Sequence, residues 1–454
     1  MTVGVIRHTL PFPVEAEAAF LALAPHLDPL LWCESRGDRG TGRSVLATGR
    51  EVSLLSGFEL DQLRDEWTAL RSRLTADVPS DCPLGLVGWL AFDVARETLG
   101  VGAVTTSPVG APSTSRFVAV DRCLEIQQDT GVATLWALGE EDSEDLAEWT
   151  EWMSRLLHGA STTTPPPLPG RAEVTSPAIW RDDPENYRRL IERAREHIRE
   201  GDAYQLCLTT EVTVAQSVDP RDLYRRLRRE QPTPYQALLQ VNGISVVASS
   251  PELFLRLDGE GRVSTKPIKG TRPRGQTPAD DALLRDHLLS SDKERAENVM
   301  IVDLMRNDLG RVCEADSIQV PVLLDVESYP SVHQLVSTVS GVLRPGVDGI
   351  DLIRATFPAG SMTGAPKHRA VTILAELESG ERGIYSGCFG FLYLDGGVEL
   401  AMTIRTAIVS DDGVRIGVGG GITWSSEADQ EIAEVGHKAR GILRCLGVSV
   451  IQYS

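Results

Sequence analysis

Apolar residues recur with two periods along the chain, and each period predicts a different kind of element. Helical spacing predicts two amphipathic helices, one with the face Leu60, Leu63, Trp67, Leu70 and Leu74, and one that begins at Asp183-Pro184 and carries Tyr187, Leu190, Ile191, Ala194 and Ile198. Apolar or alternating runs predict strands over residues 83–93, 235–241, 245–249, 253–257 and 398–409. The two kinds of element are mixed without a regular strand-helix-strand order, which indicates an α+β fold.

Two of the alternating stretches carry a polar side chain of interest. The run over residues 398–409 places Leu400, Met402 and Ile408 on one face and presents Arg405 on the smaller, more polar face. His333 lies in a second alternating stretch, and a lone histidine in a strand is more often structural than catalytic.

The clearest change in composition along the chain is a run rich in proline and threonine over residues 159–170. Such a run neither continues a helix nor forms a central strand, so it predicts a linker. We interpret residues 1–158 as an N-terminal domain, 159–176 as the linker and 177–454 as the catalytic domain.

The overall charge restricts the class of partner. The 454 residues carry a formal net charge of -19, which argues against nucleic acid or an anionic membrane as the main partner. A small anionic ligand would need locally placed cations. The 7 cysteines are scattered without a C-x-x-C pair, and neither a signal peptide nor a membrane-spanning run is visible, so we expect a cytoplasmic protein with reduced thiols.

Lys269 lies between Ile268 and Gly270, one residue after Pro267. The proline stiffens this turn and the glycine leaves room for a ligand to approach the backbone. Burial and nearby cations would favour the neutral amine, which is a nucleophile. Taken alone, Lys269 would be read as a solvated surface lysine.

Two pairs of glutamates have helical spacing, Glu294 with Glu297 and Glu431 with Glu434. A spacing of three places both acids of a pair on one helical face. Each pair taken alone would be an ordinary solvated face, but the apolar residues 301–304 argue against free exposure of the first helix. If the two faces meet, the converging carboxylates suit Mg²⁺, which prefers oxygen ligands.

Two glycine-containing loops have the composition of ligand-binding loops. The run Phe357–Lys367 offers amides and hydroxyls before a helix, but it lacks the spacing of a nucleotide-binding P-loop. The run Gly417–Gly421 lacks the helix and distal acid of a dinucleotide fingerprint, and a close approach of its backbone to a small ligand fits it better.

Taken together, these segments resemble the signatures of the chorismate-utilising enzymes. The resemblance rests on the run around Lys269, the glutamate pairs, the T-G-A-P-K motif that ends at Lys367 and the glycine run, and it covers about residues 178–447. In this family alanine commonly stands where Lys269 does, and the lysine version is similar to that of the branch that aminates chorismate at C4. The resemblance implies a sandwich of antiparallel sheets flanked by helices.

The resemblance also implies roles for individual residues. Lys269 would attack ring carbon C2 of chorismate while Glu252, in its S-P-E motif, acts as general acid on the C4 hydroxyl. Glu297 and Glu434 would bind Mg²⁺ directly and Glu294 and Glu431 through water. The implied substrate-binding residues are Gln205, Gly270, Thr271, His333, Thr363, Tyr385, Arg405, Gly419, Gly421 and Lys438.

The implied reaction converts chorismate and ammonia to 4-amino-4-deoxychorismate, for 4-aminobenzoate and folate synthesis. No G-x-C-x-G glutaminase motif is visible, so ammonia is expected from a separate glutamine amidotransferase subunit in a heterodimer. Three alternatives stay open: anthranilate formation, suggested by residues 32–35 and opposed by Lys269; water addition, opposed by Gln205, which cannot act as a base; and a non-catalytic chorismate-binding subunit.

Overall fold

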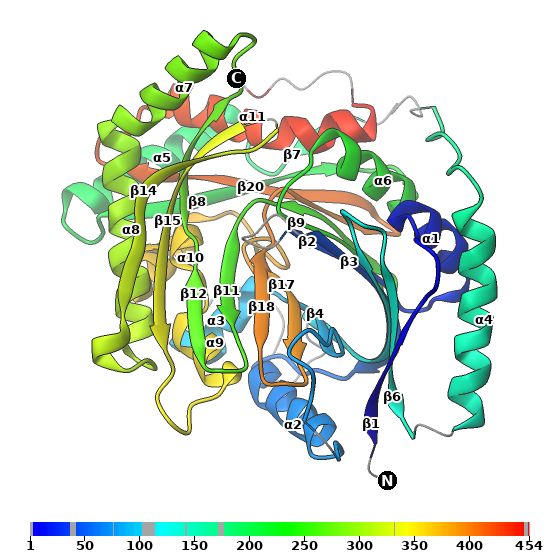
Figure 1. The fold of residues 1–454 in the computed structure, drawn as a ribbon. Helices are drawn as coiled ribbons and strands as arrows, with labels where there is room; N and C mark the ends of the chain where they lie inside the picture. The colour runs from blue at the N-terminus through cyan, green and yellow to red at the C-terminus, as the bar shows by residue number, and fades with distance from the viewer. Residues whose placement is uncertain are drawn as a thin grey trace.

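The computed structural model is an α+β molecule in which helices surround a large antiparallel sheet (Figure 1). It describes residues 3–36, 42–75, 77–101, 114–140, 143–170, 177–330, 332–448 and 453. The helices are α1 Ala16–Leu23, α2 Glu59–Arg71, α3 Ala95–Leu99, α4 Glu144–Ser161, α5 Pro184–Arg199, α6 Pro220–Glu230, α7 Pro278–Ser290, α8 Asp292–Gly310, α9 Gly349–Thr356, α10 Lys367–Leu377 and α11 Ala428–Leu446. The predicted α+β class is confirmed.

The strands come from every part of the described chain. They are β1 Gly4–Thr9, β2 Leu30–Arg36, β3 Gly42–Val52, β4 Gly85–Leu90, β5 Arg116–Gln127, β6 Ala133–Gly139, β7 Ala178–Trp180, β8 Gln205–Val214, β9 Tyr235–Val241, β10 Ile244–Ser250, β11 Leu253–Leu257, β12 Arg262–Thr265, β13 Ile268–Pro273, β14 Gln319–Ser328, β15 Val332–Val342, β16 Gly364–Ala365, β17 Cys388–Tyr393, β18 Val398–Met402, β19 Thr406–Ser410 and β20 Gly413–Thr423.

The sheet has two halves that meet at β5. One half runs from β8 through β20, β19, β10, β9, β2 and β3 to β5, and β6 and β1 continue from it. The other half starts at β4, which also pairs with β5, and runs through β17, β18, β11 and β12 to β15. β13 and β14 both pair with β15. These ladders are antiparallel.

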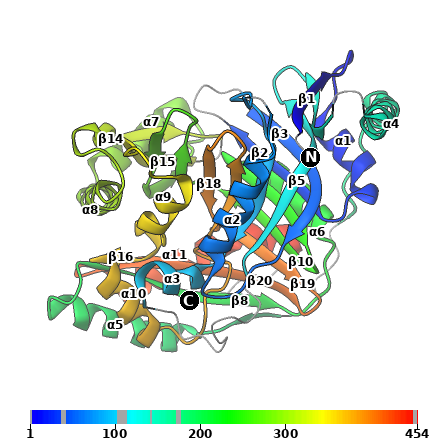
Figure 2. The same ribbon diagram turned by 90° about the horizontal axis from the view of Figure 1, so that it is seen from below.

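Alternation along each strand builds two cores. In β9, Leu239 points into a core shared with the second half of the sheet, whereas Leu238 points to a core formed with helices on the outer face. The helices α1, α5, α6, α10 and α11 supply this outer core, and α8 packs beside β15 (Figures 1 and 2). The expected sandwich flanked by helices is therefore confirmed.

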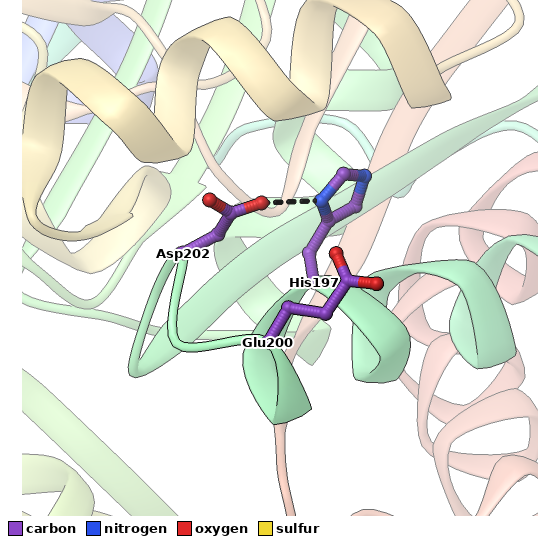
Figure 3. A group of neighbouring side chains, drawn as sticks. All are labelled: His197, Glu200 and Asp202. Atoms are coloured by element: carbon purple, nitrogen blue, oxygen red, sulfur yellow. Dashed lines mark hydrogen bonds and ion pairs between the residues drawn. The ribbon is translucent and has the colours of Figure 1, made fainter.

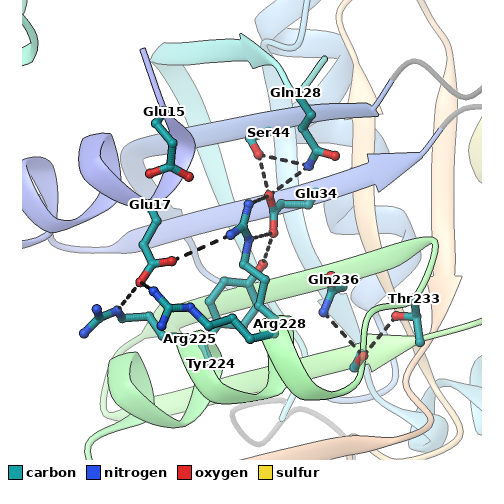
Figure 4. Close-up of polar contacts among 12 residues, drawn as sticks. Glu15, Glu17, Glu34, Ser44, Gln128, Tyr224, Arg225, Arg228, Thr233 and Gln236 are labelled. Atoms are coloured by element: carbon teal, nitrogen blue, oxygen red, sulfur yellow. Dashed lines mark hydrogen bonds and ion pairs between the residues drawn. The ribbon is translucent and has the colours of Figure 1, made fainter. Parts of the chain in front are cut away.

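Strands from the N-terminal region are built into the rest of the sheet. β2 pairs with β9, and β4 pairs with β17. A largely buried polar cluster links α1, β2 and β3 to α6, and we call it the α6 network (Figure 4). It consists of Glu17, Glu34, Ser44, Gln128, Tyr224, Arg225, Arg228 and Arg229.

Most predicted elements form close to their expected bounds. β9 and β11 have the predicted ranges, and Asp183 caps α5 by accepting a hydrogen bond from the backbone N–H of Asn186. The strand predicted over 83–93 is limited to β4, and Leu74 lies beyond the end of α2.

One strand prediction is wrong. The alternating stretch 398–409 is two strands, β18 and β19, because the chain turns between them at Arg405. Arg405 has a φ of 49°, in the left-handed region that interrupts a strand. The side-chain pattern that suggested one strand therefore hid a bend.

The predicted linker begins inside a helix, because α4 continues to Ser161. Residues 164–170 have no regular structure, and 171–176 lie outside the described residues. The boundary between an N-terminal and a catalytic domain stays a proposal. No described helix is long and apolar enough to cross a membrane.

Candidate active site

A cavity of about 690 Å³ collects side chains that are far apart in the sequence. Its wall combines β13, the N-terminal part of α8, β20, α11 and the turn between β10 and β11. The predicted site residues that line it are Glu252, Lys269, Gly270, Thr271, Glu294, Glu297, Tyr385, Arg405, Gly419, Glu434 and Lys438.

Lys269 reaches across the cavity from β13. The register between β13 and β15 shifts between Ile268 and Thr271, and Gly270 has a φ of 80° there. A Cβ on Gly270 would lie 2.9 Å from the Glu294 carboxyl carbon, so a glycine is required. A Cβ on Gly421 would lie 3.4 Å from Lys269 Nζ, which places the amine beside the glycine run of β20.

Glu252 is the candidate proton donor of the cavity. It follows β10 and is 6% exposed. Burial raises the pKa of Glu252 to about 7, although Ser361, Lys269 and Lys438 act in the opposite direction. Near neutral pH a large fraction of this carboxyl is therefore protonated and able to donate a proton.

The glutamate pairs lie on α8 and α11, as their spacing predicted. Glu297 is 8% exposed and Glu431 is 2% exposed. Lys293 Nζ lies 3.2 Å from Glu431 Oε1, and it also interacts electrostatically with Glu297 and Glu434. These acids raise the pKa of Lys293, although burial acts in the opposite direction. One lysine thus supplies positive charge to both acidic faces.

The residues present fit a hard cation. Burial raises the pKa of Glu297, and its Oε1 has no hydrogen-bond partner among the described residues. A buried carboxylate oxygen without a donor is a group that a metal ion would satisfy. The four carboxylates do not form a tight cluster of ligand atoms in this structure, and Lys293 lies among them.

The cavity wall also carries the cations Arg405 and Lys438. Burial lowers the pKa of Arg405, and no described acidic side chain is paired with it. Lys438 Nζ donates to the Gly419 carbonyl at 2.7 Å and pairs with Glu434 Oε1 at 2.8 Å. The Tyr385 ring packs on Gly417, where a Cβ would lie 2.1 Å from the tyrosine Cγ. An unpaired guanidinium in a cavity is suited to bind a carboxylate.

Some predicted residues lie behind the cavity wall. Gln205 is 1% exposed, and neither of its amide atoms has a described hydrogen-bond partner. A Cβ on Gly421 would lie 2.2 Å from Gln205 Nε2, so these two residues are in contact beside Lys269. Thr363 is buried and donates to backbone carbonyls of its own loop, and Glu431 accepts from Ser426 at 2.8 Å.

His333 is not part of the cavity lining, and this differs from the expectation that it lies beside the ring. Its imidazole interacts with Asp281 through Nε2 at 2.9 Å and with Ser328 through Nδ1 at 2.8 Å. Because alternate residues of a strand face opposite sides, its neighbours Val332 and Gln334 line the cavity instead. Sequence reasoning found the correct strand and chose the wrong face.

Sequence reasoning also missed residues that shape the wall. Lys293, Ser361 and Gln334 line the cavity. Lys293 directly precedes the glutamate pair of α8, and Ser361 lies within the run Phe357–Lys367, but neither was singled out in the sequence. Arg382 is buried behind the wall, where it donates to the Met362 carbonyl at 2.6 Å and the Cys207 carbonyl at 2.8 Å. The only sequence signal for Arg382 was its spacing of four from Glu378, its ion-pair partner.

A separate polar group lies at the end of α5 (Figure 3). His197, Glu200 and Asp202 bring ligand-type atoms within 4.8 Å of one another. The Asp202 carboxylate already accepts from His197 Nδ1 at 2.8 Å and pairs with Arg369 at 2.8 Å. These contacts account for the group as a stabilised helix end.

The chain belongs to the family of chorismate binding enzymes, whose family model matches residues 28–444. An aminodeoxychorismate synthase of Streptomyces pristinaespiralis is 41% identical over 396 residues, which cover 86% of this chain and 54% of the relative. Anthranilate synthase component 1 of Streptomyces coelicolor is 38% identical over 396 residues, covering 84% of this chain and 77% of that one.

A solved structure shows the same architecture. Anthranilate synthase component I from Streptococcus pneumoniae matches with a TM-score of 0.71 at 26% identity, covering 96% of this chain and 92% of that chain. The chain spans about half the length of the first aminodeoxychorismate synthase relative. The family and fold expected from the motifs are confirmed, whereas relatives with two different products have similar identity.

Proposed function

We propose that this protein is the chorismate-aminating component of an aminodeoxychorismate synthase. The observation that carries the proposal is Lys269, an amine that enters the family's cavity beside the glycine run of β20 and within electrostatic reach of Glu252. The names of several relatives give further support. Anthranilate synthase is the second candidate, because its component 1 also matches most of the chain.

In the first step, the Lys269 amine forms a bond to C2 of chorismate as the C4–O bond breaks. Glu252 donates its proton to the departing hydroxyl, which leaves as water. Ammonia then forms the C4–N bond, the C2–N bond breaks, and the amine of Lys269 is regenerated. Two displacements across the conjugated ring place the new amino group at C4.

Charged groups of the cavity wall would hold the substrate in this orientation. Arg405 and the Gly419 region would receive the enolpyruvyl carboxylate, and Glu297 and Glu434, supported by Glu294 and Glu431, would hold Mg²⁺ near the ring carboxylate. When bound, Mg²⁺ neutralises and polarises that carboxylate. The described chain offers positive charge there through Lys293.

The ammonia would come from a separate glutamine amidotransferase subunit, and the product would supply 4-aminobenzoate and folate synthesis. A cytoplasmic location agrees with this role. The relative from Streptomyces pristinaespiralis extends well beyond the matched region. The amidotransferase subunit is a proposal in its own right, and its test is separate from the test of the reaction on chorismate.

The test is to identify the product. Purified protein is incubated with chorismate, Mg²⁺ and excess ammonium, and products are separated by liquid chromatography with mass detection. Formation of 4-amino-4-deoxychorismate by the wild type and its loss in Lys269→Ala supports the proposal. Anthranilate or isochorismate from the wild type contradicts it. Adding glutamine with an amidotransferase in place of ammonium tests the partner separately.

A further inference from the structure

Gln334 is a buried residue of the cavity wall that the proposed mechanism leaves without a role. It lies on β15, paired with Thr271 of β13, and it is 2% exposed. Its Oε1 has no hydrogen-bond partner among the described residues. A buried carbonyl oxygen without a donor is unfavourable, and its place in the wall of a cavity makes it open to a donor from a bound molecule.

His333, the preceding residue on β15, is a polar side chain whose hydrogen-bonding groups all have partners within the protein. His333 uses both ring nitrogens, toward Asp281 and Ser328, on the other face of β15. Gln334 lines the cavity, and its carbonyl oxygen is left open there. The difference between the two faces of one strand therefore separates a structural group from a group that is available to a ligand.

The other open acceptors of the wall are suited to different partners. Among the described lining residues, the buried side-chain oxygens that the structure leaves without a short hydrogen bond are Glu297 Oε1, Ser361 Oγ and Gln334 Oε1. Glu297 carries a charge that suits a cation, and Ser361 interacts with Glu252. Gln334 offers a neutral carbonyl oxygen, which suits a neutral N–H or O–H donor, and of the two substrates ammonia has no other acceptor assigned to it.

We propose that Gln334 Oε1 accepts a hydrogen bond from the ammonia molecule that attacks chorismate. This inference rests on the proposed function, in which ammonia is the nucleophile. One N–H of ammonia points to Oε1, which leaves the nitrogen lone pair free to form the C4–N bond. The electron pair of the breaking C2–N bond returns to the Lys269 nitrogen as a neutral amine, and the proton lost by the new C4 ammonium group returns to the Glu252 carboxylate.

A neutral acceptor also selects the reactive form of the nucleophile. A carboxylate at this position would attract ammonium, which has no lone pair to form a bond. A carboxamide has no such preference for the cation and cannot remove a proton from water. Gln334 is thereby a specificity-determining residue for ammonia.

The test compares Gln334→Met, which keeps the length and removes the acceptor, with Gln334→Glu, which keeps the shape and adds charge. Initial rates are measured with Mg²⁺, varying ammonium at saturating chorismate and then chorismate at saturating ammonium. We expect Gln334→Met to raise the KM for ammonia about tenfold, with the KM for chorismate changed less than about twofold. Gln334→Glu should move the optimum for ammonia use to higher pH.

Gln236→Met is the matched control, because Gln236 is a buried glutamine that does not line this cavity. It should leave the KM for ammonia unchanged. A raised KM for chorismate with an unchanged KM for ammonia in Gln334→Met would overturn the proposal, as would unchanged values in both Gln334 variants. If the wild type makes anthranilate, the proposed product is wrong but the Gln334 comparison still applies. A wild type that consumes no ammonia would overturn both.

Discussion

The cavity around Lys269 and the α6 network both bury charged side chains, but only the α6 network pairs its charges within the protein. In the α6 network, Glu34 accepts hydrogen bonds from Ser44 at 2.6 Å, Tyr224 at 3.0 Å and Arg228 at 2.6 Å. In the cavity, Glu297 Oε1 has no described partner and Arg405 has no paired acid. The first arrangement is complete within the chain, whereas the second is left open.

This difference separates structural charge from functional charge. Burying an ion costs free energy that only partners in good geometry offset. The α6 network finds those partners within the protein and thereby joins β2, α1 and α6. In the cavity, the free-energy cost of burying these charges is offset only when a substrate or a metal ion binds. Substitutions in the two regions should therefore have opposite effects on activity and on stability.

The largest expected effect is on catalysis. Lys269→Ala should lower kcat/KM at least about a thousandfold, or about 4 kcal/mol of transition-state stabilisation, because the nucleophile is lost. Its free energy of unfolding should change much less, by about 1 kcal/mol, because Lys269 acts on Glu252, Glu297 and Glu434 only through electrostatic attraction. Steady-state kinetics and urea unfolding measure the two quantities. A variant that keeps wild-type turnover contradicts the role of Lys269.

The complementary substitution breaks the α6 network. Glu34→Ala should lower the free energy of unfolding by about 3 kcal/mol, because Arg228 and Tyr224 lose a buried partner. The folded fraction should keep a normal KM for chorismate. Glu66→Ala is the control, since its partner Arg50 is 63% exposed and such a pair contributes less than about 1 kcal/mol. Equal losses in the two variants would contradict the comparison.

The proposed metal site should show an intermediate effect. Glu297→Gln removes a charge from the acidic group, so it should raise the Mg²⁺ concentration for half-maximal activity by about 10- to 100-fold. Burial, with Glu294 and Glu431, raises the pKa of Glu297 despite the attraction to Lys269 and Lys293, so loss of this unfavourable buried charge should not lower stability without metal. Mg²⁺ titration and urea unfolding with a chelator test this. Asp303→Asn on the exposed face of α8 is the control and should change neither quantity.

The smallest effect is the pH dependence of Glu252. Its pKa is raised by burial from 4.5 to about 7, so the active protonated form is lost as pH rises through 7. Above that pH, kcat/KM should fall up to about tenfold per unit. The group's contribution to stability is complete below pH 4.5 and is lost as pH rises through 7.

Glu252→Gln serves as the reference for this prediction. The free energy of unfolding of this variant should lack the part that depends on ionisation of residue 252. As pH rises from 4.5 to 7, the wild type should therefore lose stability relative to the variant. Urea unfolding across that range measures it. A difference that stays constant with pH contradicts the raised pKa of Glu252.

Local pattern was enough to predict much of the fold and of the site. Helical and alternating periods gave α5, β9 and β11, because each reports which side chains are buried along one element. The glutamate spacing predicted the acidic faces of α8 and α11. Alternation failed at Arg405, where the left-handed backbone separates β18 from β19 without changing the order of apolar residues.

The sequence by itself determined the family, the α+β class and the candidate nucleophile, because these depend on residue types and short spacings that are local to the chain. Only the tertiary structure decided that Gln334 and not His333 lines the cavity, that Lys293 lies between the glutamate pairs, and that the charges of the α6 network are satisfied. The physical reason is that the direction of a side chain and its partners depend on strand register and on helices packed against the sheet, which no local pattern encodes.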